Sequence, residues 1–147
     1  MKSIKLKYSF LICCISLLFY SCAKENEAYI FTHDNNQITQ LICRASHTGG
    51  EFRGVIHEYN KDGERMLEDY TFEDIEGGFG LILVPISKTL EKDVDITNVY
   101  LRATVKYDAI ITPTLSGRHD ISGDGIIVTV KSGERTKRQY RIRGYYE

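Results

Sequence analysis

The sequence has no tryptophan, only two prolines and only four cysteines among its 147 residues. Cys13 and Cys14 lie in an apolar N-terminal run and Cys22 directly follows that run, so only Cys43 is left for a folded domain. A disulfide framework needs cysteine pairs, and the sequence therefore excludes one. The lack of both tryptophan and a cysteine pair also excludes an antibody-type immunoglobulin domain, which is built around them.

The motifs of common catalytic and metal centres are absent as well. The chain contains no His-x-x-x-His, Cys-x-x-Cys or glycine-rich phosphate loop, and no Gly-x-Ser-x-Gly elbow surrounds Ser116 or Ser122 near His119. The stretch 120–125 lacks the alternating oxygen ligands and closing glutamate of a calcium loop, so we interpret it as a tight turn. Cys43 lies in an apolar run, where a packed thiol is the expected outcome. We therefore expect no enzymatic activity, no cofactor and no metal site.

The N-terminus has the three parts of a secretory signal peptide. Three lysines precede an apolar run over residues 10–20, and Ser21 stands before Cys22. The run is shorter than the ~20 apolar residues that a membrane-spanning helix needs. We predict a signal peptide over residues 1–21, lipid on Cys22, a tether over residues 22–28 and one folded domain over residues 29–147.

The residues around Cys22 resemble the lipobox of bacterial lipoproteins, in the aromatic-tolerant form found in Bacteroidota. In such proteins the cysteine carries a diacylglycerol and, in many bacteria, a further acyl chain such as palmitate, and more than one chain gives stable anchoring. The resemblance implies attachment to the outer membrane. The polar residues Lys24 to Glu27 are similar to a surface-export signal, and they also fit a plain solvated tether. Display on the cell surface, a periplasmic orientation and ordinary cleaved secretion stay open as alternatives.

The charge of the mature chain gives no support for nucleic acid as a partner. The leader contains three of the nineteen basic residues and none of the twenty acidic ones, so the mature chain has a net charge of −4. Proteins that bind nucleic acid usually carry an excess of positive charge. We expect no nucleic acid partner.

Alternating apolar residues predict strands along the whole domain. Val99, Leu101, Ala103 and Val105 alternate with polar residues, as in a strand with one buried face. Residues 126–130 and 139–143 repeat this pattern around a turn at 131–134, which predicts a C-terminal hairpin with Tyr140 and Ile142 facing inward.

Further strands are predicted in the first half of the domain. Residues 52–59 and 67–72 flank Asn60-Lys61-Asp62-Gly63, whose Asp-Gly pair favours a tight hairpin turn. Residues 80–85 form a strand that Pro85 ends, and only residues 87–92 favour a short helix. About seven short strands separated by turns predict an all-β fold, an antiparallel immunoglobulin-like β-sandwich.

Several segments occur in an order that resembles a domain of Bacteroidota surface lipoproteins. They are Leu81 to Pro85, Asp95 to Val99, Tyr107 to Pro113, Asp120 to Gly123, Ile126 to Val130 and Gln139 to Ile142. The resemblance covers Phe79 to Gly144 and implies an immunoglobulin-like sandwich of unknown function just after a lipid anchor. Two features depart from that family. The loop from Gly133 to Tyr140 is longer and basic, and no large ligand-binding module follows. Three alternatives stay open: the domain acts by itself, assists a partner or has lost the module that it once carried.

Basic residues concentrate on the C-terminal hairpin, whereas acidic residues concentrate between positions 62 and 76. Arginine pairs well with carboxylate and sulfate, and tyrosine stacks on sugars, so the hairpin is a candidate site for an anionic glycan or an acidic protein surface. The candidate residues are Arg135, Lys137, Arg138, Arg141, Arg143, Tyr145 and Tyr146. The alternative is a solvated edge strand, on which lysine and arginine suppress aggregation.

Two functions stay open from the sequence. The first is a non-catalytic binding or adhesion module for glycan or protein, which predicts a concave surface with exposed rings among Tyr100, Tyr107, Tyr145 and Tyr146. The second is a structural accessory lipoprotein that stabilises a larger envelope complex, which predicts a flat apolar patch.

The lipid anchor gives the first testable prediction. Cys22→Ala removes the only thiol available for lipid at the predicted cleavage site, so the variant is expected to lose incorporation of labelled palmitate and to leave the membrane fraction. Cys43→Ala is the control, and it is expected to keep both properties. Equal labelling of the wild type and Cys22→Ala would contradict the assignment.

Overall fold

In this computed structural model, residues 33–45, 49–67 and 69–147 are described, and the predicted signal peptide and Cys22 lie outside them. The strands are β1 (Ile38–Ala45), β2 (Glu51–Arg53), β3 (Val55–Tyr59), β4 (Phe79–Ile86), β5 (Val99–Val105), β6 (Ile110–Thr112), β7 (Arg118–His119), β8 (Ile126–Lys131) and β9 (Lys137–Tyr146). Two short helices accompany them, α2 (Phe72–Ile75) and the 3-10 helix η2 (Lys88–Leu90).

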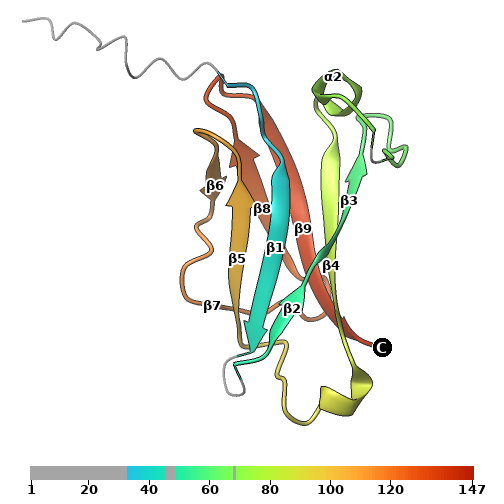
Figure 1. Ribbon diagram of the computed structural model, residues 1–147, viewed down its shortest axis with the longest axis vertical. Coiled ribbons are helices and arrows are strands. Elements are labelled where there is room, and N and C mark those ends of the chain that lie inside the picture. Colours follow the sequence, from blue (N-terminus) through green and yellow to red (C-terminus); the bar gives the residue numbers. More distant parts are fainter. Residues whose placement is uncertain (1–32, 46–48, 68) are drawn as a thin grey trace, which may run out of the picture. The chain divides into compact units, whose positions relative to one another are not determined.

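The strands form two sheets that pack as a sandwich (Figure 1). One sheet has the order β2-β1-β5-β7 and the other has the order β3-β4-β9-β8-β6. The predicted all-β sandwich is therefore confirmed, with nine described strands where about seven were expected.

One strand pair departs from the expected antiparallel pattern. β4 and β9 run parallel, with Gly80 opposite Tyr140 and Ile82 opposite Ile142. The chain from β4 to β9 first builds β5 and β7 in the other sheet, and this long connection allows the parallel pairing. β9 lies between β4 and β8, so the alternative that the basic strand is a sheet edge is wrong.

The core is filled from both sheets in the predicted alternation. Val99 and Leu101 of β5, and Val128 and Val130 of β8, are buried as expected. Cys43 is also fully buried, and burial raises the pKa of its thiol to about 11. The burial confirms the prediction of a packed thiol.

The predicted hairpin around residues 60–63 is only half right. The turn forms, since the Asn60 side chain accepts hydrogen bonds from the backbone N–H groups of Asp62 and Glu64, and Gly63 has a φ of 82°. The predicted partner strand over 67–72 is wrong, because residue 67 and residues 69–72 form no strand and β3 pairs with β4 instead. The chain then enters α2, where the Asp74 carboxylate accepts hydrogen bonds from the backbone and the hydroxyl of Thr71. This Thr-x-x-Asp spacing is a helix-start signal that the strand prediction overlooked.

The other predicted elements need smaller corrections. η2 lies inside the predicted helical range 87–92, and β8 and β9 form the predicted C-terminal hairpin. Residues 137–140 belong to β9, so the basic loop expected over 133–140 is shorter. β4 continues through Pro85 to Ile86, because pairing with β3 ends at Leu83 and no strand of the described residues pairs with Pro85 on that side.

The close contact between β4 and β9 gives a stability prediction. A Cβ atom on Gly80 would lie 2.1 Å from ring carbons of Tyr140, which is fully buried and held by hydrogen bonds. Gly80→Ala is therefore expected to lower the free energy of unfolding by about 1–3 kcal/mol in urea denaturation. Gln139→Ala, on the exposed side of β9, is the control and is expected to change it by less than about 0.5 kcal/mol. Equal stability changes in the two variants would contradict the prediction and would show that the Tyr140 ring shifts to make room for the added methyl group.

Candidate binding surface

The alternation of β9 sends the predicted site residues to opposite sides of the sheet. Lys137, Arg141 and Arg143 are exposed on the outer side, and Tyr145 is half-buried on the same side. Arg135 lies in the turn before β9 and is exposed. Tyr146 points inward, where its hydroxyl donates a hydrogen bond to the carbonyl oxygen of Val94.

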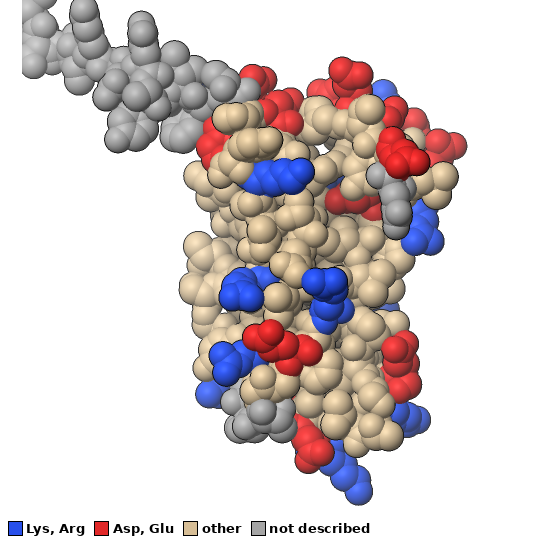
Figure 2. All heavy atoms as spheres, in the orientation of Figure 1, with Lys and Arg blue, Asp and Glu red and all other residues tan. Residues whose placement is uncertain are grey.

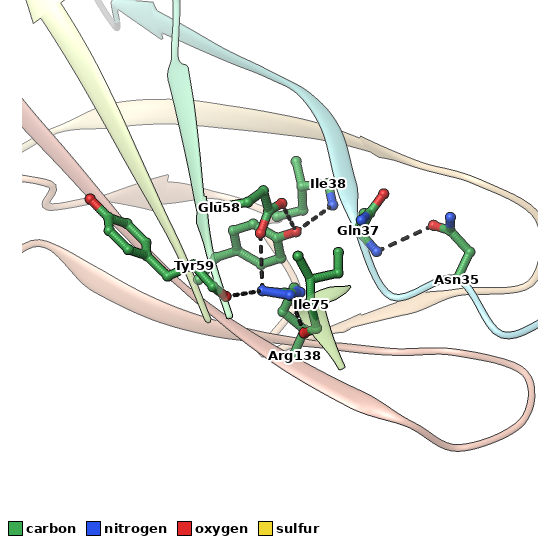
Figure 3. A network of polar contacts seen from close by, with 8 residues as sticks. Asn35, Gln37, Ile38, Glu58, Tyr59, Ile75 and Arg138 are labelled. Atoms are coloured by element: carbon green, nitrogen blue, oxygen red, sulfur yellow. Dashed lines mark hydrogen bonds and ion pairs between the residues drawn. The ribbon is translucent and has the colours of Figure 1, made fainter. Parts of the chain in front are cut away.

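Arg138 is a correction to the predicted site, because it is a core residue with 1% of its surface exposed. Its guanidinium forms an ion pair with Glu58 at 3.0 Å and donates hydrogen bonds to the carbonyl oxygens of Tyr59 and Ile75 (Figure 3). An external ligand therefore does not reach it. The sequence did indicate this burial, because Arg138 is two residues before the inward-facing Tyr140 and four before Ile142, and alternate residues of a strand face the same side.

The same network includes Tyr140. Its hydroxyl donates to Glu58 and accepts a hydrogen bond of 3.1 Å from the backbone N–H of Ile38. Burial raises the pKa of Glu58, against the lowering effects of the Tyr140 hydrogen bond and the Arg138 charge. Burial, followed by the charge of Glu58, also raises the pKa of Tyr140, which stays protonated. The network joins β1, β3, α2 and β9 through these hydrogen bonds. Its side-chain members Glu58, Arg138 and Tyr140 are buried, so it has a structural role.

The outer side of the five-stranded sheet carries apolar residues. The site predicted from the sequence did not include them, because it consisted of basic residues and tyrosines. Val55 of β3 is 47% exposed and Phe79 of β4 is 46% exposed, and Leu81 and Leu83 of β4 are half-buried on the same side. The rings of Tyr59 and Phe79 stack with centroids 4.8 Å apart. Strands of a sandwich usually present polar residues outward, so this composition is unusual.

The basic and apolar residues lie directly beside each other. Leu81 is opposite Arg141 and Leu83 is opposite Arg143 in the parallel register of β4 and β9, and Val55 is opposite Leu83 on the other side of β4. We call this set the outer face. It consists of Val55, Tyr59, Phe79, Leu81, Leu83, Arg141, Arg143 and Tyr145.

The arginines of the outer face have no acidic partner among the described residues, where the ion pairs are Arg138–Glu58 and His33–Asp108. Arg141 donates a hydrogen bond of 2.8 Å to the backbone carbonyl of Asp124, which orients its side chain and leaves its charge uncompensated. The outer face can therefore accept carboxylate or sulfate groups next to apolar contacts.

The acidic residues gather elsewhere, as the sequence predicted. Asp62, Glu73, Asp74 and Glu76 line a shallow depression of about 320 Å³ beside α2. Figure 2 shows acidic side chains crowded at the end of the domain that carries α2. This cluster follows the turn and the helix start, and the Asp74 carboxylate is used in capping that helix.

The remaining aromatic candidates are dispersed. Tyr100 of β5 and Tyr107, which follows β5, are 41% and 69% exposed and belong to the four-stranded sheet or its flanking turn. Tyr100 contacts Arg118, and Tyr107 stacks on His33. The structure does not bring them together with Tyr145 on one strand face.

The described residues contain no cluster of three or more His, Cys, Asp or Glu side chains arranged to hold a metal ion. Over the same residues, no helix combines the length and apolar character needed to cross a membrane.

Comparison with known proteins gives little similarity. No protein-family model matches the sequence, and no curated protein matches it. A crystal structure of a protein from Bacteroides fragilis, whose name marks it as a secreted protein, aligns with a TM-score of 0.44 and 14% identity over 82% of this chain and 98% of that chain.

The burial of Arg138 predicts how its loss changes stability. Arg138→Met leaves the Glu58 carboxylate buried without its cation, so the free energy of unfolding is expected to fall by about 3–5 kcal/mol. Arg141→Met, on the exposed side of the same strand, is expected to change it by less than about 1 kcal/mol. Urea denaturation of both variants measures the difference.

A double variant tests the cause. Glu58→Gln together with Arg138→Met removes both charges and keeps an acceptor for the Tyr140 hydroxyl, so it is expected to be more stable than Arg138→Met alone. If the double variant is as unstable as the single one, loss of packing and not the unpaired carboxylate explains the effect.

Proposed function

We propose that this chain is a non-catalytic, lipid-anchored protein of the cell envelope whose β-sandwich binds a protein partner through the outer face. The observation that carries the proposal is that one sheet face combines exposed apolar side chains with arginines that have no acidic partner among the described residues. Arginine and aromatic residues are enriched in protein interfaces, whose cores are otherwise poor in charge. The expected partner presents acidic groups around an apolar patch.

Two features favour protein over glycan. The outer face contains the aliphatic residues Val55, Leu81 and Leu83, and Val55 lies opposite Leu83. Side chains of this kind favour contact with apolar protein surfaces. Sugar binding usually relies on aromatic rings, and the Tyr59 and Phe79 rings stack on each other at one end of the face. Glycan binding at these rings is the alternative ligand class.

The structural accessory role is the alternative function. It uses the same surface in a permanent complex, whereas a binding or adhesion module uses it in a reversible one. A lipid on Cys22 supports both roles, because it holds the domain at the membrane, where either kind of partner is found at high local concentration.

A photo-reactive amino acid placed in living cells tests the site. At Leu83, on the outer face, the probe is expected to crosslink to one discrete protein. At Arg102, which is exposed on β5 of the other sheet, it is expected to give no such product. The same crosslinks from both positions, or none from Leu83, would contradict a protein interface on the outer face.

Charge reversal separates the reversible and permanent roles. Arg141→Glu with Arg143→Glu is expected to abolish the Leu83 crosslink, because like charges then face the acidic partner. A reversible partner is also lost when cells are broken in high salt, whereas a permanent complex survives purification. A glycan array probed with the protein tests the alternative ligand, and binding there that depends on Tyr59 and Phe79 would favour it.

A further inference from the structure

Two neighbouring strands have free edges at the same place in the sandwich. β3 is the edge strand of its sheet, and β2 pairs with β1 only at Ile42 to Arg44. In the described part of the chain, the beginning of β1 therefore has no strand on its β2 side. Figure 1 shows β1 and β3 diverging toward the end that carries α2.

A groove of about 730 Å³ lies between these edges. Thr39 of β1, Ile56 of β3 and Leu67 of the following segment line it. A second depression of about 370 Å³ shares Thr39 and Ile56 and extends to Arg53. The two depressions are therefore neighbours that meet at Thr39 and Ile56.

The backbone of β3 presents hydrogen-bonding groups to this groove. Met66 donates from its backbone N–H to the carbonyl oxygen of Glu58 at 2.8 Å, so the backbone groups of Glu58 point away from β4. In an antiparallel pair, this direction alternates along the strand, and Ile56 therefore points the same way. Gly54 closes the far end by donating to the carbonyl oxygen of Leu41 at 2.9 Å. The N–H and C=O of Ile56 and the N–H of Glu58 are left facing the groove.

The side chains around the groove define what fits it. Leu67 is 79% exposed and offers an apolar contact, and Ile56 is half-buried. Arg53 and Arg65 are exposed near its two ends, and Arg65 is held beside β3 by a contact of 2.7 Å to Nδ1 of His57. Glu58 is buried and paired with Arg138, so the charge offered to a ligand is positive.

From these observations, we infer that the groove binds an extended segment of another protein as an added strand along β3. Its backbone hydrogen bonds to Ile56 and Glu58, its alternate apolar side chains contact Ile56 and Leu67, and acidic residues at its ends meet Arg53 and Arg65. Strand addition to an exposed edge obtains affinity from the backbone and specificity from alternate side chains. The groove borders the outer face, because Val55 lines both. The other residues that contact the added strand, Ile56, Leu67 and the two arginines, are not part of the outer face.

Panning a phage-displayed random dodecapeptide library on the full chain in detergent tests the inference. The expected peptides alternate apolar and polar residues and carry acidic ends. Their binding is expected to weaken about tenfold or more with Arg65→Glu or Leu67→Lys, because charge or shape no longer matches. The matched controls are Arg102→Glu, on exposed β5, and Ile110→Lys, 64% exposed on β6 at the opposite sheet edge, and both are expected to retain binding.

Amide hydrogen exchange on the wild-type chain supplies a readout that does not depend on variant stability. Without peptide, the Ile56 amide is expected to exchange faster than those of Val55 and His57, which face β4. With a selected peptide, the amides of Ile56 and Glu58 are expected to become protected. Three results would overturn the inference: no enrichment, peptides that bind all four variants equally, or unchanged protection at these amides. Absence of the Leu83 crosslink alone would contradict a protein interface on the outer face and would leave strand addition to β3 intact.

Discussion

The buried ion pair between Glu58 and Arg138 is the interaction on which the arrangement of this sandwich depends. A buried charge is tolerated only when it is paired and hydrogen-bonded. Here the carboxylate is held by Arg138 and by Tyr140, and the guanidinium also donates to carbonyl oxygens of β3 and α2. Since Tyr140 also accepts from the N–H of Ile38, the network fixes β1, β3 and β9 relative to one another.

This constraint also sets the exposed surface. With Arg138 and Tyr140 inward, strand alternation places Arg141 and Arg143 outward beside Leu81 and Leu83 of β4. The parallel pairing of β4 and β9 keeps the apolar and basic residues at the same level of the sheet. The register that places Arg138 and Tyr140 in the core also determines which side chains point outward. The composition of the outer face therefore follows from the packing of the core.

The groove between β1 and β3 results from the course of the chain that brings Glu58 into the network. The chain leaves the four-stranded sheet at Gly54, between β2 and β3, and enters the five-stranded sheet, where Glu58 meets Arg138 and Tyr140. The separation from β1 exposes the backbone of Ile56 between two arginines. The outer face and the groove thus offer different chemistry, side-chain contacts on one and backbone pairing in the other, and the two sites can be tested independently.

The sequence by itself determined the local features. The period-two pattern predicted the faces of β5 and β8, the C-terminal hairpin, the packed thiol of Cys43 and the all-β class, because burial of alternate side chains is a local property of a strand. It also showed that basic residues concentrate on the last strand, where the structure exposes Lys137, Arg141 and Arg143. Thr71 and Asp74 carried the signal for α2, and the parity of Arg138 carried the signal for its burial, although basic composition pointed the other way.

Only the tertiary structure decided which strands are neighbours. The parallel pairing of β4 with β9, the central position of β9 and the pairing of β3 with β4 in place of residues 67–72 join segments far apart in the chain. The same is true of the Arg138–Glu58 pair, of the leucines beside Arg141 and Arg143, and of the groove between β1 and β3. The alternation of side chains along a strand is set by neighbouring residues. Strand pairing depends on the packing and hydrogen bonding of the whole sandwich, and a single sequence does not show which of the possible pairings is most stable.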